Sequence, residues 1–385
     1  MLQRLRPITV IALLWVAGLM AGAQFAKISV LLPEFRALYP AHTDHIAWLL
    51  TLVSVVGAVL GGFAGVLANK GGPRRLLIAS LAAAGAISLW QSSIPPFAPM
   101  LVSRVLEGVT HLGIVVTAPA LMAETGSERW RGATMALWST FFSVSFALFA
   151  WFGIPALDNW QVGGLLQLHG LCLLVTAGLL AVLLRSSTKD EARSEHVQVA
   201  PASMFGAYKS VRVVWAGVCW FFYTLTFLAL LTILPAQMSD AIRPTVTTAM
   251  SLVGIATSLL LVPVLLLRMR ATAVVLAAFA TVVLIMLLGG SLDPVVFALS
   301  LFAILGVIQG ATFAAVVELN GTMQDRTLGY GVMAQTGNLG NLIGTPVTFA
   351  VLNVTTVQGL LFGTAALYVV GFGVLLVLAR QIVRR

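Results

Sequence analysis

Apolar residues fill twelve long segments of the chain, and short polar gaps separate them. In the first half the segments lie near residues 8–32, 46–68, 76–92, 98–123, 132–156 and 163–184. In the second half they lie near residues 211–238, 245–268, 272–290, 294–318, 329–354 and 358–381. One helix needs about 20 apolar residues to cross a bilayer. The pattern therefore predicts an all-α membrane protein with twelve transmembrane helices in two six-helix bundles.

The longest polar stretch divides the chain between the sixth and seventh segments. It predicts an N-terminal bundle over residues 1–184, a cytoplasmic linker over 185–210 and a C-terminal bundle over 211–385. Of the 22 Lys and Arg residues, only Arg36 and Arg243 fall in loops on the side opposite the termini. Cytoplasmic loops carry the excess of positive charge. We therefore expect both termini and the linker to be cytoplasmic, and the protein to lie in the cytoplasmic (inner) membrane.

The composition excludes a soluble protein, because 59% of the residues are hydrophobic and only 9% are charged. The net charge of +9 comes from cations in short gaps rather than from a basic tail, so it indicates membrane orientation and no nucleic-acid partner. Cys172 and Cys219 lie within apolar segments, where burial without a disulfide is expected. We expect a monomer in the lipid bilayer, with a small solute and protons as partners and with no metal or other cofactor.

Three ionisable residues share one face of the fourth apolar segment. Arg104, Glu107 and His111 have the spacing of a single helical stripe. An arginine at the centre of a membrane helix costs about 2.5–3.5 kcal/mol even on the lower scale, so the stripe should face the bundle interior or an aqueous cavity. Lys27 precedes Pro33 in the first segment, and at 1.5 Å per residue it lies as deep as Arg104, roughly 10 Å below the outer face. We predict that these four side chains form one substrate and proton site.

Each of these residues also has a structural interpretation, and the sequence leaves the alternatives open. Lys27 could extend its ammonium to the membrane interface. Arg104 and Glu107 could form an ion pair that only stabilises the bundle. His111 could be a hydrogen-bonded packing residue, and His169 is interpreted as structural.

The second half offers uncharged candidates for the site, namely Tyr223, Gln309, Gln335 and Asn338. It has no Lys or Arg at a comparable depth, so recognition of a charged solute is expected in the N-terminal half. Gln335 and Asn338 lie in a glycine-rich eleventh segment. That composition is typical of close helix packing and also of a moving helix that lines a cavity.

The turn after the second segment combines glycines with cations. It contains Gly65, Asn69, Lys70, Gly72 and Arg74. Glycine permits a tight turn and close helix approach, and cations can bond the last carbonyls of a helix, so this turn is expected to gate the cytoplasmic side. Its spacing resembles the signature of the major facilitator superfamily, in which Gly is followed by three residues, Asp, a cation, any residue, Gly and paired cations. Asn69 departs from that signature, because it replaces the usual Asp.

A second motif is similar to one in the same superfamily. Arg104-Val-Leu-Glu107-Gly108 matches the Arg-x-x-x-Gly pattern, which is associated with proton coupling. In the turn signature described above, Pro73 is a second departure, because it replaces the first of the paired cations. The resemblance covers the whole chain. It implies that the first and fourth helices of each half line a central cavity.

Two cytoplasmic turns share a short repeat, an acidic-Arg pair followed three residues later by Gly. The pair is Glu128 and Arg129 before the fifth segment, and Asp325 and Arg326 before the eleventh. A duplicated six-helix unit would place copies at these positions. Both pairs are expected to belong to the cytoplasmic gate.

The resemblance implies a secondary active transporter that works by alternating access. No Lys follows a Gly in the sequence, so it has no Gly-Lys-Ser/Thr phosphate loop, which argues against ATP as the energy source. Glu107 beside His111 suits coupling to protons. Two cations against one acid point to a small organic or inorganic anion, with Arg104 in direct contact and Glu107 carrying the proton.

Other functions stay open on the sequence alone. A proton-driven exporter of drugs or amphipathic metabolites is favoured by the aromatic content. It is disfavoured by the fifth segment, which lacks the Gly-Pro-Gly-Gly pattern of many drug/proton antiporters. A membrane enzyme would need a metal or nucleophile cluster, which the scattered histidines do not supply. A non-transporting receptor or scaffold would not need the gate turn. Import or export, and symport or antiport, are equally open.

Overall fold

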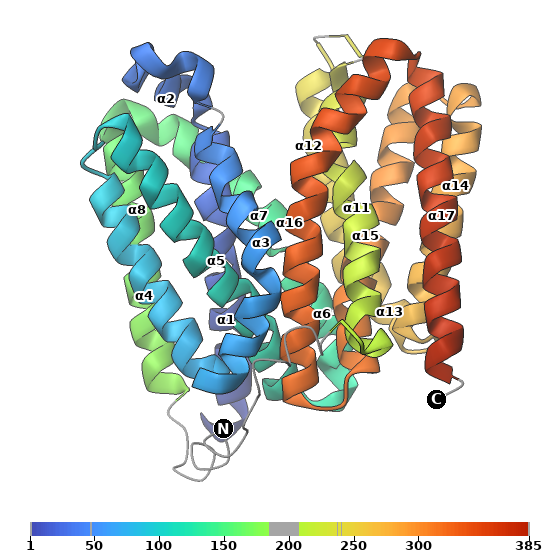
Figure 1. The fold of residues 1–385 in the computed structure, drawn as a ribbon, viewed down its shortest axis with the longest axis horizontal. Helices are drawn as coiled ribbons and strands as arrows, with labels where there is room; N and C mark the ends of the chain where they lie inside the picture. Colours follow the sequence, from blue (N-terminus) through green and yellow to red (C-terminus); the bar gives the residue numbers. More distant parts are fainter. Residues whose placement is uncertain (1, 47, 185–207, 237, 240, 384–385) are drawn as a thin grey trace. The chain divides into compact units, whose positions relative to one another are not determined.

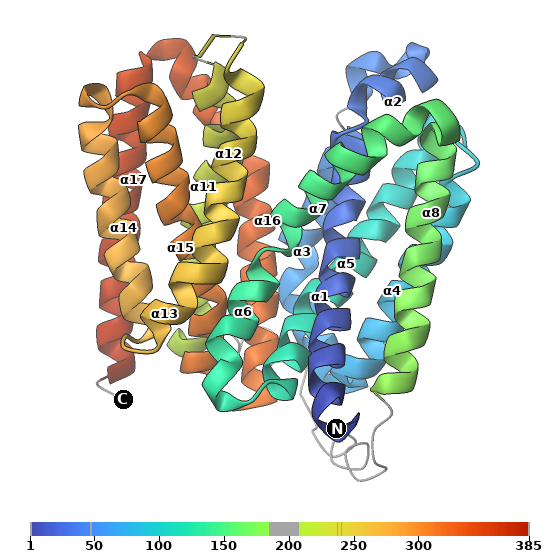
Figure 2. The ribbon, with the colours of Figure 1, turned by 180° about the vertical axis from the view of Figure 1, so that it is seen from behind.

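The computed structural model describes residues 2–46, 48–184, 208–236, 238–239 and 241–383, and all regular elements among them are helical (Figures 1 and 2). Most of the predicted linker lies outside these residues. The contacts divide the chain into two compact units, Met1–Ser127 with Phe141–Phe205, and Glu128–Thr140 with Gly206–Arg385.

The helices of the chain up to the linker follow one another through short turns or directly. They are α1 (Leu2–Ser29), α2 (Leu32–Leu38), η1 (Pro40–His45), α3 (Trp48–Gly71), α4 (Pro73–Gln91), α5 (Phe97–Thr125), η2 (Glu128–Trp130), α6 (Arg131–Ser139), α7 (Phe141–Leu148), η3 (Phe149–Gly153) and α8 (Ile154–Leu183).

The helices after the linker follow the same plan. They are α11 (Val211–Ala236), α12 (Arg243–Ala256), η4 (Thr257–Leu261), α13 (Val262–Leu266), α14 (Ala271–Leu288), η5 (Gly289–Ser291), α15 (Pro294–Leu319), α16 (Met323–Val354) and α17 (Val357–Val383).

The predicted all-α membrane fold is confirmed, although two of the spans are interrupted. Among the described residues, eight helices are long and apolar enough to cross a membrane. The bent pair Glu128–Ser139 and Phe141–Gly153 adds a ninth if it is one span. The predicted eighth span contains the π-helical turn η4, which ends two residues before Pro263. Proline has no N–H and its ring clashes with the carbonyl four residues earlier, so a widened turn relieves the clash.

The two units repeat one packing pattern. In the first unit α5 packs on α3 and α4, α4 packs on α8, and α1 packs on α7. In the second unit α15 packs on α12 and α14, α14 packs on α17, and α11 packs on α16. Figure 1 shows the pair α4 and α8 in one unit and the pair α14 and α17 in the other. Each contact has a counterpart at the same place in the chain order, as expected for two copies of a six-helix repeat.

The first part of the predicted fifth span belongs to the second unit. Its helix α6 packs against α13 and α15. Trp138 is fully buried, and Ser139 Oγ lies 2.7 Å from Ser258 Oγ. A Cβ on Gly132 would lie 2.9 Å from Leu266 Cδ1, so glycine permits this close packing. The continuation α7 packs against α1 in the first unit, so the chain passes between units at Thr140.

Four exposed tryptophans mark one end of the first unit. Trp48 begins α3, Trp90 lies near the end of α4, and Trp151 and Trp160 lie in η3 and near the start of α8. Their exposed fractions are 50%, 47%, 73% and 51%. Tryptophan is enriched at membrane–water interfaces, so this end of the unit lies at one interface.

Candidate functional site

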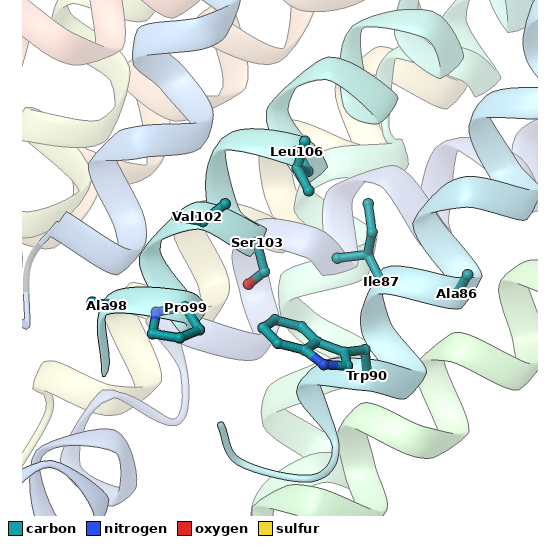
Figure 3. A pocket seen from close by; sticks show the side chains of 8 residues that line it. All are labelled: Ala86, Ile87, Trp90, Ala98, Pro99, Val102, Ser103 and Leu106. Atoms are coloured by element: carbon teal, nitrogen blue, oxygen red, sulfur yellow. The ribbon is translucent and has the colours of Figure 1, made fainter. Parts of the chain in front are cut away.

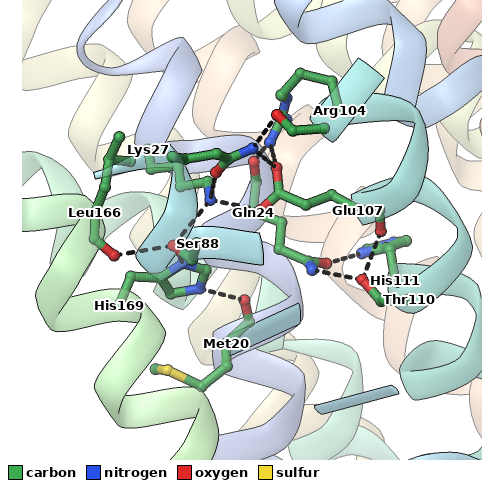
Figure 4. A network of polar contacts seen from close by, with 12 residues as sticks. Met20, Gln24, Lys27, Ser88, Arg104, Glu107, Thr110, His111, Leu166 and His169 are labelled. Carbon is green, nitrogen blue, oxygen red and sulfur yellow. Dashed lines mark hydrogen bonds and ion pairs between the residues drawn. The ribbon is translucent and has the colours of Figure 1, made fainter. Parts of the chain in front are cut away.

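A cluster of buried charges joins α1 to α5 in the first unit (Figure 4). This ion cluster consists of Lys27, Arg104 and Glu107, and none of the three side chains is exposed. Lys27 Nζ lies 2.5 Å from Glu107 Oε1, and the Arg104 guanidinium donates to Glu107 Oε2. The structure therefore brings together the residues that share a stripe and a depth in the sequence. The burial of Lys27 excludes its extension to the interface.

Lys27 has an acceptor for each of its three ammonium hydrogens. Its Nζ donates to Ser88 Oγ at 3.2 Å, to Gln91 Oε1 at 2.6 Å and to Glu107. Ser88 and Gln91 are both buried and lie three residues apart on α4, so one face of α4 supplies both acceptors. An ammonium has three donors and no acceptor. The surroundings of Lys27 therefore match its charged form.

Arg104 and Glu107 are also fully engaged. Arg104 donates from Nε to Leu49 O at 2.7 Å and from Nη2 to Gln24 O at 2.8 Å, which ties α5 to α3 and α1. Glu107 Oε2 accepts from Gln91 Nε2 at 2.8 Å as well as from Arg104. With both cations and the carboxylate ionised, the cluster carries one positive charge in excess. A buried cluster of this kind is stabilising only while its partners stay together.

Gly108 explains the spacing of the Arg-x-x-x-Gly motif. It faces α3, where a Cβ would lie 2.8 Å from Val56 Cβ and 3.1 Å from Val53 O. Because this position has no side chain, α5 approaches α3 closely, and Arg104 reaches the Leu49 carbonyl. The motif thus combines a charge with the packing that buries it.

His111 lies one turn beyond Glu107 and contacts α1. Its Nδ1 lies 3.2 Å from Gln24 Oε1 and 3.3 Å from Ala21 O, and its ring meets the Phe25 ring edge to face at 5.1 Å. Gln24 also accepts from the ion cluster through its backbone carbonyl. The predicted stripe is therefore continuous in the structure, and Gln24 is a member that the sequence pattern does not identify.

A second histidine belongs to the same network. His169 of α8 has Nδ1 3.1 Å from Ser88 Oγ and Nε2 3.0 Å from Met20 O. A lone histidine in an apolar helix shows no pattern, so the sequence did not link it to the cluster. The available signal was on α4, where the polar residues Ser88 and Gln91 lie one turn apart.

In the second unit, two of the four predicted polar residues meet. Tyr223 Oη donates to Gln309 Oε1 at 3.0 Å, and Gln309 Nε2 donates to Ser139 O. The Tyr223 ring also stacks between Trp220 and Phe227, with centroid distances of 4.6 and 5.1 Å. These three rings form an aromatic ladder along α11.

The other two predicted residues of the second unit bond different groups. Asn338 Nδ2 donates to Ala334 O of its own helix at 2.8 Å, and Gln335 Oε1 accepts from Tyr208 Oη. Both lie on α16, which packs closely on α11 through glycines. Close helix packing is therefore one established role of the glycine-rich eleventh segment.

The turn predicted to gate the cytoplasmic side begins α4. Gly72 has φ of 80°, in the left-handed region, and Arg74 Nη2 donates to Ala181 O near the end of α8 at 3.2 Å. Gly65 and the side chains of Asn69 and Lys70 lie outside the part of α3 whose surroundings the structure describes. The latch that these residues were expected to form stays a prediction.

Gly72→Val is expected to impair transport while leaving the helices folded. The reason differs from the expected helix clash, because a Cβ at Gly72 would meet no atom within 4 Å. The cost comes from the left-handed backbone, which is about 1–3 kcal/mol for a residue with a side chain. Proteoliposome uptake and the melting temperature would be measured beside Gly178→Val in α8, where a Cβ also meets no atom within 4 Å but φ is not positive. Full uptake by Gly72→Val would reduce the turn to a connector.

The second copy of the acidic-Arg pair lies in the first turn of α16 and has a local role. Asp325 N donates to Thr322 Oγ1 at 3.0 Å, and Thr322 Oγ1 donates to Asp325 Oδ2 at 2.8 Å, so Thr322 is the N-cap of the helix. Arg326 is buried and donates from Nε to Asn320 O at 2.9 Å.

The first copy of the pair, before α6, has a different structure. Glu128 lies 3.9 Å from Arg131, and the Arg129 guanidinium lies 5.6 Å from the centre of the Trp130 ring. Trp130 is exposed. The two copies therefore share their sequence but not their contacts.

An apolar groove lies beside the ion cluster, between α4 and α5 (Figure 3). It has a volume of about 750 Å³ and is lined by the exposed Trp90, Val102 and Leu106, with Ser103 among them. Ser103 Oγ accepts from Gln91 Nε2 at 2.7 Å. Two polar side chains thus lead from the groove to the cluster.

Comparison with known proteins assigns the chain to a family. The Major Facilitator Superfamily matches residues 14–345. The 3-(3-hydroxy-phenyl)propionate transporter of Escherichia coli (strain K12) is 24% identical over 240 residues, which span 60% of this chain and 57% of that protein. The E. coli fucose:proton symporter FucP is similar in fold, with a TM-score of 0.76, 17% identity and coverage of 98% and 99% of the two chains. The human organic anion transporter MFSD10 has a TM-score of 0.72, 17% identity and coverage of 96% and 99%. The chain therefore belongs to the Major Facilitator Superfamily, a family of membrane transporters and not of enzymes.

Proposed function

We propose that this secondary transporter moves small organic anions and couples their movement to protons. The observation that carries the proposal is the ion cluster, in which two buried cations face one carboxylate. An anion that reaches Lys27 and Arg104 would offset the excess positive charge and compete with Glu107 for its donors. Glu107 would then take up a proton more readily, which links solute binding to protonation.

The names of two similar proteins support the same class of solute. One is a transporter of 3-(3-hydroxy-phenyl)propionate and the other an organic anion transporter. We therefore place an aromatic carboxylate first among the candidates.

Proteoliposomes loaded with 3-(3-hydroxyphenyl)propionate test the proposal. Counterflow exchange at equal pH measures solute movement, and uptake under a pH gradient measures coupling. With one proton per anion, a gradient of one pH unit supports about tenfold accumulation. Glu107→Gln should keep exchange and lose accumulation, whereas Arg104→Ala should lose both. Fucose serves as the neutral control. Exchange of fucose without exchange of the acid would refute the anion assignment.

An exporter of amphipathic drugs is the second candidate, and the groove between α4 and α5 favours it. Its apolar lining leads through Ser103 toward Gln91 and the ion cluster. Proton-driven efflux of ethidium from inside-loaded vesicles, without exchange of the carboxylate, would favour this alternative.

We also propose two bundles over residues 1–184 and 211–385, a cytoplasmic linker, and a monomer in the cytoplasmic membrane with both termini inside. Ser187→Cys is expected to resist an impermeant maleimide in intact cells and to react after permeabilisation, because positive linkers stay in the cytoplasm. Ser93→Cys, at the exposed turn after α4, is the control that should react in intact cells. Labelling of Ser187→Cys in intact cells would reverse the orientation.

A further inference from the structure

We propose that His169 is the far station of a proton path that starts at Glu107 and runs through Lys27 and Ser88. The inference rests on the proton coupling proposed above and specifies its route. It gives a role to a histidine that the sequence pattern marks as structural.

Three consecutive contacts form the path (Figure 4). Lys27 Nζ lies 2.5 Å from Glu107 Oε1 and 3.2 Å from Ser88 Oγ, and Ser88 Oγ lies 3.1 Å from His169 Nδ1. The path crosses four helices, α5, α1, α4 and α8. All four side chains are buried, with exposed fractions of 4% or less. Protons move along such a chain between groups that both donate and accept.

The partners of His169 limit where its protons sit. Nε2 faces the Met20 carbonyl, which only accepts, so Nε2 carries a hydrogen. A neutral ring then has a free lone pair on Nδ1 and accepts from the Ser88 hydroxyl. A charged ring has a hydrogen on Nδ1 and donates to Ser88 instead. The protonation state of His169 therefore sets the orientation of the Ser88 hydroxyl.

Ser88 has one hydroxyl hydrogen and two acceptors for it. Its Oγ lies 2.9 Å from Leu166 O and 3.1 Å from His169 Nδ1. When the hydrogen points to Leu166, the path is broken. When it points to His169, Lys27 can donate to the Ser88 oxygen while Ser88 donates to the ring. Ser88 thus opens and closes the connection.

Proton transfer along the path begins at Lys27. A Lys27 N–H bond breaks, its electron pair stays on Nζ, and the proton joins Ser88 Oγ. The original Ser88 O–H bond breaks, and that proton joins the lone pair of His169 Nδ1. Lys27 is left as a neutral amine, and it returns to the ammonium by taking the proton that Glu107 carries. The net change moves one proton from Glu107 to His169.

The alternative route through His111 lacks a relay group. His111 Nδ1 contacts the Gln24 amide oxygen and the Ala21 carbonyl oxygen, and these two atoms accept hydrogen bonds but carry no proton to pass on. Arg104, the remaining member of the cluster, keeps its proton in proteins. His169, in contrast, contacts the Ser88 hydroxyl and also lines a mainly apolar cavity of about 450 Å³ between α1, α7, η3 and α8.

The charges of the ion cluster act on a charge at the His169 ring. Lys27 on α1 and Arg104 on α5 are positive and oppose a charge on the ring, whereas the Glu107 carboxylate on α5 favours one. Neutralisation of Lys27 by proton transfer therefore favours the charged ring.

His169→Gln and Ser88→Ala test the path in proteoliposomes with 3-(3-hydroxyphenyl)propionate. Both variants should keep more than about half of the wild-type exchange at equal pH and lose the roughly tenfold accumulation that one pH unit supports. Glutamine can still donate to Met20 O and accept from Ser88, so it keeps the contacts without carrying the proton. Ser80→Ala on the same helix and the exposed His45→Gln are matched controls that should accumulate like wild type. Accumulation by His169→Gln at the wild-type level would overturn the inference. The inference would also be overturned if His111→Gln lost accumulation while His169→Gln kept it.

A solute-free measurement separates this inference from the choice of solute. In protein labelled with ¹⁵N-histidine, the His169 ring should change from one N–H to two between high and low pH. Ser88→Ala should shift this transition, because the ring loses its partner at Nδ1. If proteoliposomes do not exchange 3-(3-hydroxyphenyl)propionate but the His169 ring still gains its second N–H, the proposed solute is wrong and the proton path is retained. A His169 ring that keeps one N–H over the whole pH range in which the protein stays folded refutes the path.

Discussion

Glu107→Leu is expected to lower the free energy of unfolding by about 3–5 kcal/mol, because it leaves Lys27 and Arg104 buried without their carboxylate. None of the three side chains is exposed in the wild type. Thermal unfolding of the purified protein in detergent would measure the loss. Glu128→Gln is the control, because the Glu128 side chain is 91% exposed and its pair with Arg131 is loose, so little change is expected. Equal melting of the two variants would mean that water reaches the ion cluster.

A triple variant separates a structural from a functional role of the same cluster. Lys27→Met, Arg104→Met and Glu107→Leu together remove all three charges and keep apolar volume. Replacement of a whole buried ion cluster by hydrophobic residues is often neutral or stabilising. The triple variant should therefore melt well above Glu107→Leu, yet it should not exchange 3-(3-hydroxyphenyl)propionate. Exchange by the triple variant would make the cluster purely structural.

Gly344→Ala is expected to be the most harmful single methyl addition among the glycines of α16. Its Cβ would overlap the Leu225 carbonyl oxygen and lie 2.8 Å from the Leu225 carbonyl carbon, so two backbones would have to separate. Such overpacking costs about 1–3 kcal/mol and sometimes more. Gly340→Ala should cost less, because its new methyl first meets the Thr224 side chain and lies 2.9 Å from the nearest backbone atom, the Phe221 carbonyl oxygen.

Gly363→Ala in α17 is the matched control for these variants. A Cβ there would meet no atom within 4 Å. Alanine is the better helix former by about 0.8–1.0 kcal/mol, so this change should raise the melting temperature slightly. If Gly344→Ala melted like Gly363→Ala, α11 and α16 would not be in close contact in the folded protein.

The sequence predicts the residues of the ion cluster for two reasons, their spacing on a helix and the free-energy cost of placing a charge against lipid. The spacing of Arg104, Glu107 and His111 places them on one face, and a charge cannot face lipid cheaply. Lys27 follows from its depth alone. The structure joins these residues, whereas their roles in binding the solute and carrying the proton remain predictions.

The rest of the network was not predictable, because it depends on how helices cross. His169 meets Ser88 where α8 crosses α4, and this crossing is close because Gly85 and Gly170 face each other. A Cβ on either glycine would lie 3.0 Å or less from the other's carbonyl oxygen. The residues next to His169 in the sequence do not indicate that its partner is Ser88, which is distant in the chain. The backbone strain at Gly72 is likewise visible only in its φ angle.

Cutting the chain in the linker would separate α6 from the unit in which it packs. Trp138 is buried there, and Ser139 bonds Gln309 and lies 2.7 Å from Ser258, all beyond the cut. One fragment would carry α6 without its packing partners. The other fragment would expose the apolar surface beside Leu266 on which α6 packs. Two fragments made separately would each be incomplete. If the two fragments were produced together, packing of α6 against the second fragment would hold them together as a split transporter.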